Sequence, residues 1–255
     1  MQLAHLNWRQ AQEKLADPNT VVVIPVGSTE QHGPIGPLGT DWLIPQWITA
    51  EMEKRTDILV TPVIPFGVAT NHTAFEGTLD MGLETMIVIM RGVCQNLAKH
   101  GARLFIVVNG HGGNDPAIEK AGLELARETG ALITLLDWWG IAPELNKIWT
   151  TGHGDAQEVS AIMHIKPELI DIGSCPETIV KDLSDSLHFT HLSSVKFGDA
   201  HIKLVRDIKK GIPMGGFGGI DSQKANAEWG KDMMQAVVDY FVAFTEEFRR
   251  LPLDK

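Results

Sequence analysis

The sequence predicts a three-layer α/β/α sandwich with a mainly parallel β-sheet, built as a single domain over residues 1–255. Short runs of continuous apolar, often β-branched residues alternate with longer segments of helical spacing. Strands that lack polar alternation are buried on both faces, as in a parallel sheet covered by helices. The apolar content of 44% in 255 residues suffices for one large core. The sequence shows no repeat, low-complexity tract or linker that would divide it.

The individual elements follow in order along the chain. Apolar runs predict strands over residues 21–26, 58–64, 103–108 and 131–136. Helical spacing predicts helices over residues 42–55, 82–100, 115–129, 155–164 and 222–249. Asp115 is the predicted N-cap of the third helix, Pro116 its first helical residue and Gly130 its C-cap. Residues 173–219 are predicted to be irregular with some strand.

Charge and hydropathy limit the possible partners. The net charge of -10 disfavours nucleic acids and anionic membranes, because both require a basic face. The sequence contains no apolar run near the roughly 18 residues that span a bilayer and no secretory signal pattern. Cys94 and Cys175 lack metal-site or redox spacing, as expected of thiols in a reducing compartment. We therefore expect a soluble, cytoplasmic protein.

The segment VGSTEQHGPIGPLGTD follows the first predicted strand, where open parallel sheets bind their ligands. Glu30 and His32 are two residues apart, so they project to the same side of an extended chain. Asp41 follows after a loop rich in glycine and proline. This donor set suits zinc, manganese or iron rather than calcium. The competing interpretation is a surface loop in which Asp41 caps the next helix.

Two further polar segments follow later elements. In NGHGGND, His111 is flanked by glycines after the third strand; such a turn binds either a metal or an anion, but it lacks the spacing of a nucleotide-binding motif. Together with the first segment, it favours a metal. In GHGDAQEVS, Asp155 and Glu158 have capping-box spacing. The local pattern of this third segment therefore favours a helix cap over a metal ligand for Glu158.

The segments VVVIPVGSTEQHGPIGPLGTD, FEGTLDMGLET, ARLFIVVNGHGGN and HGDAQEVS, in this order, resemble the creatininase (creatinine amidohydrolase) family. The resemblance implies an α/β/α fold, two divalent ions per chain (zinc, manganese or iron) and a homo-oligomer, often a hexamer. It implies that Glu30, Asp41 and His111 hold one ion, and that His32 and a bridging Asp41 hold the other. It also shifts Glu158 from helix cap to metal ligand, because relatives with NGHGGN carry a glutamate at that place.

The chain departs from creatininase itself at several positions. Creatininase has a glutamate two residues after the histidine of NGH, where this chain has Gly113. It has another before the histidine that matches His153, where this chain has Gly152. The loop of residues 34–37 also differs from the family pattern. Creatinine is therefore a poor prediction for the substrate, although Trp149 matches a pocket tryptophan of the family.

A charge count supports a hydrolytic mechanism. Three carboxylates, two divalent ions and a bridging hydroxide sum to zero, so the cluster fits a cleft. We expect the hydroxide to attack a carbonyl of a small, cyclic amide, with His153, or as second choice His72, protonating the leaving group. His72 matches a histidine that many relatives carry. Trp139 and Trp149 are predicted to form an aromatic wall for the substrate.

Two alternatives remain open from the sequence. The same chemistry would open the ring of a cyclic polyol diketone by C–C hydrolysis, the reaction of a creatininase relative in inositol breakdown. From another class, the chain would be a non-catalytic anion- or nucleotide-binding α/β domain that uses NGHGGN and the glycine-rich residues 215–219. That interpretation predicts no stoichiometric metal. Residues 215–219 are otherwise expected to form a lid or a subunit contact.

Overall fold

The computed structural model describes residues 1–176, 179–218 and 221–253. A four-stranded sheet in the order β2-β1-β3-β4 occupies its centre, and every pair in it is parallel. Its strands are β1 (Val21–Val26), β2 (Ile58–Val60), β3 (Leu104–Asn109) and β4 (Leu132–Asp137). Because the strands are parallel, their carboxyl ends meet at one edge of the sheet.

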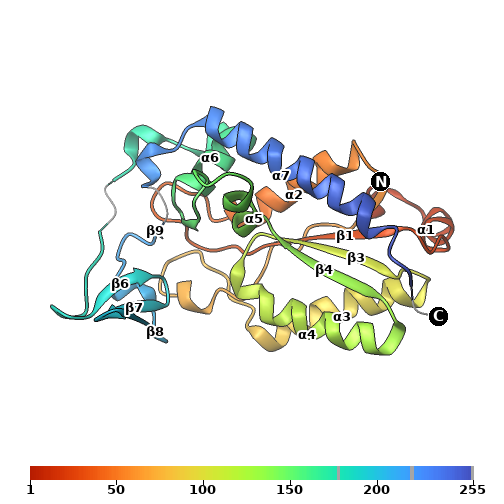
Figure 1. Ribbon diagram of the computed structural model, residues 1–255, viewed down its shortest axis with the longest axis horizontal. Helices are drawn as coiled ribbons and strands as arrows, with labels where there is room; N and C mark the ends of the chain where they lie inside the picture. The colour runs from red at the N-terminus through yellow and green to blue at the C-terminus, as the bar shows by residue number, and fades with distance from the viewer. Residues whose placement is uncertain (177–178, 219–220, 254–255) are drawn as a thin grey trace.

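Alternate residues of the buried strands face two different helical layers. In β1, Val21 and Val23 belong to the core cluster on one side, and Val22 and Ile24 to the cluster on the other. The first side is covered by α2 (Thr40–Glu53) and α7 (Ala227–Phe248), and the second by α3 (Leu83–Lys99) and α4 (Asp115–Thr129). Figure 1 shows the sheet between these layers. The predicted α/β/α sandwich with a parallel sheet is confirmed.

The second half of the chain adds smaller elements around the carboxyl edge of the sheet. Helices α5 (Trp138–Leu145) and α6 (Ala156–Ile165) pack on α7. Strands β5 (Gly152–His153) and β9 (Phe217–Gly218) form an antiparallel ribbon. A three-stranded antiparallel sheet of β6 (His188–His191), β7 (Ser194–Phe197) and β8 (Ala200–Lys203) lies at the end of the molecule away from both termini (Figure 1).

Two sequence-based boundaries differ from the structure by more than two residues. The strand predicted over 58–64 ends at Val60. Thr61 still donates to the Val23 carbonyl, but Pro62 has no N–H, and the next hydrogen bond, to the Pro25 carbonyl, comes from Ile64 and not from Val63 as regular pairing would require. The terminal helix predicted from residue 222 begins at Ala227, after an N-cap at Asn226 whose side chain accepts from Trp229. A separate 3₁₀ turn covers Ser222–Lys224.

The predicted N-cap at Asp115 is also wrong. A 3₁₀ turn over Gly112–Asn114 already leads into α4, so Asp115 has helical backbone angles and is the first residue of the helix. Its carboxylate accepts a hydrogen bond from Asn109 instead. The predicted C-cap at Gly130 is confirmed, with a left-handed backbone. Among the described residues, no helix has both the length and the apolar character needed to cross a membrane.

Candidate metal centre

The predicted metal ligands converge at the carboxyl edge of the sheet. Glu30 and His32 lie in the loop after β1, Asp41 in the first turn of α2, His111 directly after β3, and Glu158 in the first turn of α6. All but His111 are buried. A cavity of about 440 Å³ opens here, within the usual size of a small-molecule site, and its wall includes Asp41, His72, His111, Trp139, His153 and Glu158.

Glu30, Asp41 and His111 form the first group of potential ligands. Nδ1 of His111 lies 3.1 Å from Glu30 Oε1 and 3.2 Å from Asp41 Oδ2. Among the described residues, neither carboxylate oxygen has a hydrogen-bond donor. His111 Nε2 donates to the Val68 carbonyl at 2.8 Å, so in the neutral ring the Nδ1 lone pair faces the two oxygens. Three buried lone pairs that converge in this way call for a cation.

A second group lies on the other side of Asp41. His32 Nε2 is 2.8 Å from Asp41 Oδ1 and 3.6 Å from Glu158 Oε2. His32 Nδ1 donates to the Glu30 carbonyl at 3.0 Å, which turns the Nε2 lone pair of the neutral ring toward the carboxylates. His32, His153 and Glu158 also form a set of potential ligands. The two oxygens of Asp41 thus face two different imidazoles.

Without bound ions, the buried carboxylates of this cluster favour the protonated, positively charged forms of its imidazoles. Burial lowers the pKa of His32, but Asp41, Glu158 and Glu30 outweigh it and raise the pKa to about 10. Burial likewise opposes charge on His111, yet Glu30 and Asp41 raise its pKa well above the ordinary value. Burial raises the pKa of Glu158 to about 8. Burial also disfavours the charged form of Asp41, but the two imidazoles hold its pKa far below the usual range. Divalent ions would replace these protons.

Glycine and asparagine residues bring the two sequence segments together. A Cβ at Gly110 would lie 1.8 Å from the Asp41 carbonyl oxygen, so only glycine lets α2 approach the end of β3 this closely. Asn114 donates to the Gly27 carbonyl at 3.0 Å and accepts from the Val68 N–H at 3.0 Å. This asparagine is not among the site residues predicted from the sequence.

Glu158 combines features of both predicted roles. Asp155 is the N-cap of α6 and accepts from the N–H groups of Gln157 and Glu158. The Glu158 carboxylate accepts from Gly154 N at 2.6 Å, one residue before the position that a capping box uses. The same Oε2 atom faces His32. The cap contact therefore leaves the carboxylate at the candidate metal centre.

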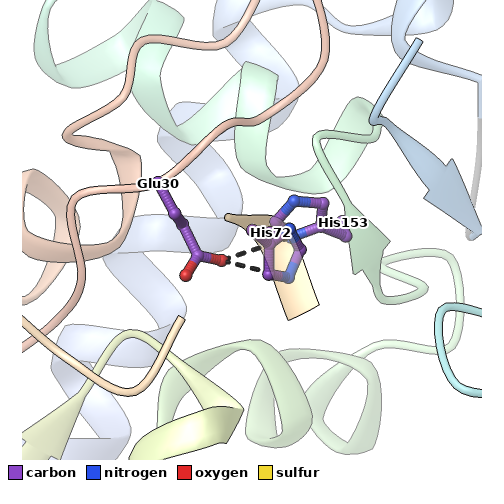
Figure 2. A group of neighbouring side chains, drawn as sticks. All are labelled: Glu30, His72 and His153. Atoms are coloured by element: carbon purple, nitrogen blue, oxygen red, sulfur yellow. Dashed lines mark ion pairs between the residues drawn. The ribbon is translucent and has the colours of Figure 1, made fainter. Parts of the chain in front are cut away.

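His72 and His153 form a third group of potential ligands together with Glu30, as Figure 2 shows. His72 lies in a 3₁₀ turn (Thr70–His72) and His153 on β5. Their ring centroids are 4.4 Å apart, and the His153 and His32 centroids are 4.5 Å apart. Burial lowers the pKa of His72, and it lowers that of His153 more strongly.

The structure separates the two tryptophans predicted to form the substrate wall. Trp139 lines the cavity. Trp149 is 7% exposed and packs in the core beside α5 and α7, and within the described chain it is not among the cavity-lining residues. Leu192 and Ser193, from the turn between β6 and β7, line the cavity instead, although the sequence analysis did not predict them. Of the predicted lid or contact at residues 215–219, Gly219 lies outside the described residues.

The fold and the site define an α/β/α protein with a candidate divalent-metal centre at the carboxyl edge of a parallel sheet. The creatinine amidohydrolase (creatininase) family model matches residues 4–245. The chain belongs to the creatininase family, whose members are metal-dependent hydrolases. The resemblance inferred from the sequence is therefore confirmed.

Individual relatives are diverse. Creatinine amidohydrolase of Pseudomonas putida is 27% identical over 192 residues, covering 67% of this chain and 74% of that protein. A mycofactocin precursor peptide peptidase of Mycobacterium ulcerans is 32% identical over 161 residues, covering 58% of this chain but only 60% of that protein. The 3-dehydro-scyllo-inosose hydrolase of Thermotoga maritima is 26% identical over 271 residues, covering 98% of this chain and 84% of that protein.

Solved structures show the same fold. A creatinine amidohydrolase crystal structure superposes with a TM-score of 0.78 at 22% identity, covering 97% of each chain. A manganese form of creatininase gives a TM-score of 0.75 at 23% identity and covers 97% of this chain. At this level of identity, the superpositions support the architecture and not a substrate.

Proposed function

We propose that this chain hydrolyses a C–N bond of a small, cyclic amide with the help of two divalent ions, zinc, manganese or iron. The observation that carries the proposal is the placement of Asp41, whose Oδ1 faces His32 at 2.8 Å and whose Oδ2 faces His111 at 3.2 Å. A carboxylate with two imidazoles on opposite oxygens is the arrangement expected of a bridging ligand.

Each predicted ligand has a role in this scheme. Glu30, Asp41 and His111 would hold one ion, and His32, Asp41 and Glu158 the other. The ions would supply a nucleophile from water at neutral pH and polarise the substrate carbonyl. The chain orients the ligands itself: backbone carbonyls fix the rings of His32 and His111, and Gly154 holds Glu158.

Other groups in the cavity would handle the substrate. Trp139 offers an apolar face to a flat ring. His72 and His153 are the neutral imidazoles within reach of the reacting centre, so they are the candidates to take a proton from the attacking water and pass it to the leaving nitrogen. The anion-binding interpretation of NGHGGN has less support, because Nδ1 of His111 faces two carboxylate oxygens that would repel an anion.

C–C hydrolysis of a cyclic polyol diketone is the second candidate. It is favoured by the inosose hydrolase relative, whose alignment covers 98% of this chain. The same centre would polarise a ketone as readily as an amide, and only the leaving atom differs. A homo-oligomeric assembly and a cytoplasmic location remain predictions from the sequence.

Elemental analysis tests the metal centre. We expect protein purified without added metal to hold about two divalent ions per chain. Asp41→Ala should lose both, and His111→Ala should lose mainly the ion held with Glu30. His164→Ala, outside the site beside Trp47, is the matched control and should retain the wild-type content. Full metal content in both site variants would overturn the ligand assignment.

A substrate screen tests the bond type. The panel should contain small cyclic amides, short peptides and cyclic polyol ketones, assayed on the metal-loaded enzyme and on Asp41→Ala. Turnover of an amide that is lost in Asp41→Ala supports C–N hydrolysis. Turnover of the ketones without the amides would instead establish the second candidate.

A further inference from the structure

Gln31 occupies the space between the two histidines that flank the metal centre. Its side chain is buried, with the residue 4% exposed. The Gly33 N–H donates to Gln31 Oε1 at 2.9 Å, and a backbone N–H can only donate. This contact fixes the amide so that its NH₂ group points toward His72 and His153.

The amide determines which nitrogen of His72 carries the proton. Gln31 Nε2 lies 2.7 Å from His72 Nδ1, and an amide nitrogen donates but does not accept. Nδ1 must therefore be the acceptor, without a hydrogen of its own. In the neutral ring, the proton is then on Nε2, which lies 3.5 Å from Glu30 Oε1 (Figure 2).

The main chain of the same residue determines the state of His153. His153 Nε2 lies 2.7 Å from the Gln31 carbonyl oxygen, which can only accept, and 2.9 Å from Gln31 Nε2, which can only donate. The carbonyl contact is the shorter one, and both amide hydrogens of Gln31 have other acceptors, in His72 and Gly215, so we assign a hydrogen to His153 Nε2. The neutral ring then presents the bare Nδ1 to the site, 3.9 Å from Glu30 Oε1. The second amide hydrogen of Gln31 is taken by the Gly215 carbonyl at 3.3 Å. Every donor in this network thus has an acceptor.

We propose that Gln31 is a positioning residue that gives His72 and His153 opposite roles: His72 presents an N–H to the reacting centre, and His153 presents a lone pair. His153 is then the base: its bare Nδ1 takes a proton from the attacking water and returns it to the leaving group. His72 keeps its proton and donates a hydrogen bond to the reacting centre, because loss of that proton from a neutral ring would leave an imidazolate. This deepens the proposed function and rests on it for the leaving-group step.

The assignment also decides between overlapping ligand sets. Glu30, His72 and His153 are close enough to hold an ion. His72 would have to offer a bare Nε2 for that, with a hydrogen on Nδ1 pointing at the Gln31 NH₂ group. Two donors would then face each other at 2.7 Å. We therefore infer that His72 is not a metal ligand, whereas His153 remains available as one.

Gly215 completes the arrangement. Its φ of +86° lies in the left-handed region, and a Cβ there would lie 1.8 Å from Gln31 Oε1. Any other residue would displace the amide. The loop before β9 thus reaches the centre through this contact.

Nitrogen NMR tests the proposal directly, without a substrate. Zinc-loaded protein with ¹⁵N-labelled histidine would give long-range ¹H–¹⁵N spectra that distinguish the tautomers, assigned through His72→Gln and His153→Gln. We expect hydrogen on Nε2 and none on Nδ1 in both rings. A hydrogen on Nδ1 of neutral His72 would overturn the proposal, whether or not any substrate is turned over.

The variant Gln31→Glu provides a second test, of the role of the Gln31 amide. A carboxylate only accepts, so Nδ1 of His72 should gain a hydrogen, while His153, held by the main-chain carbonyl, should keep Nε2–H. His5 and His164 lie outside the site, so their nitrogen NMR signals should not change. We expect kcat to fall about 10–100-fold, with KM and metal content nearly unchanged. An unaltered His72 signal in a folded variant would refute the proposed role of Gln31.

Discussion

Binding of metal ions should release protons, and the structure predicts roughly how many. In the metal-free protein at pH 7, His32 has a pKa of about 10, that of His111 is raised well above its ordinary value, and that of Glu158 is about 8. All three groups therefore carry a proton that the ions must displace. Addition of zinc should release about two to three protons per chain at pH 7.

The sign of the pH dependence follows from these shifts. For each proton that the ions displace, the apparent Kd should fall about tenfold when the pH rises by one unit. With two to three protons displaced, the apparent Kd should therefore fall by about 10²–10³ per pH unit near pH 7. Above pH 8 the slope should decrease, because Glu158 has then lost its proton. Calorimetry in buffers of different ionisation enthalpy measures the released protons. Release of fewer than about one proton per chain would refute this account of the cluster.

Further predictions concern packing and ligand roles. Gly110→Ala should lower the unfolding free energy by at least about 1–3 kcal/mol and reduce metal content, because its Cβ would meet the Asp41 carbonyl oxygen. The control Gly92→Ala has open space around its Cβ and should be neutral or stabilise by up to about 1 kcal/mol. Urea unfolding compares the two variants. Glu158→Gln should lose an ion yet keep the unfolding free energy of the metal-free form within about 1 kcal/mol, since an amide oxygen still accepts from Gly154; retained metal with lost stability would mean a cap. Trp149→Ala should cost about 3–5 kcal/mol in thermal or urea unfolding; full stability with raised KM would contradict its core position.

Local patterns in the sequence were sufficient for the architecture. The continuous apolar run of β1 predicts a strand with two buried faces, and the structure divides its residues between two core clusters. The glycine after α4 has the left-handed backbone that a C-cap requires. The carboxyl-edge rule for parallel sheets correctly predicted that Glu30 and Asp41 lie near His111. In the first two cases the physical cause lies within a few residues of its effect, and in the third it is the parallel pairing of β1 with β3, which places their carboxyl ends side by side.

The tertiary structure alone determined the finer chemistry of the site. Nothing in the sequence near Gln31 indicates that its amide contacts His72, 41 residues away, and His153, 122 residues away. Trp149 follows the same strand as Trp139, yet one is in the core and the other lines the cavity. Sequence periodicity indicates on which face of its strand or helix a side chain lies, because the backbone geometry of each element repeats locally. Hydrogen-bond partners between distant segments depend on how the layers pack, and the sequence alone does not show this.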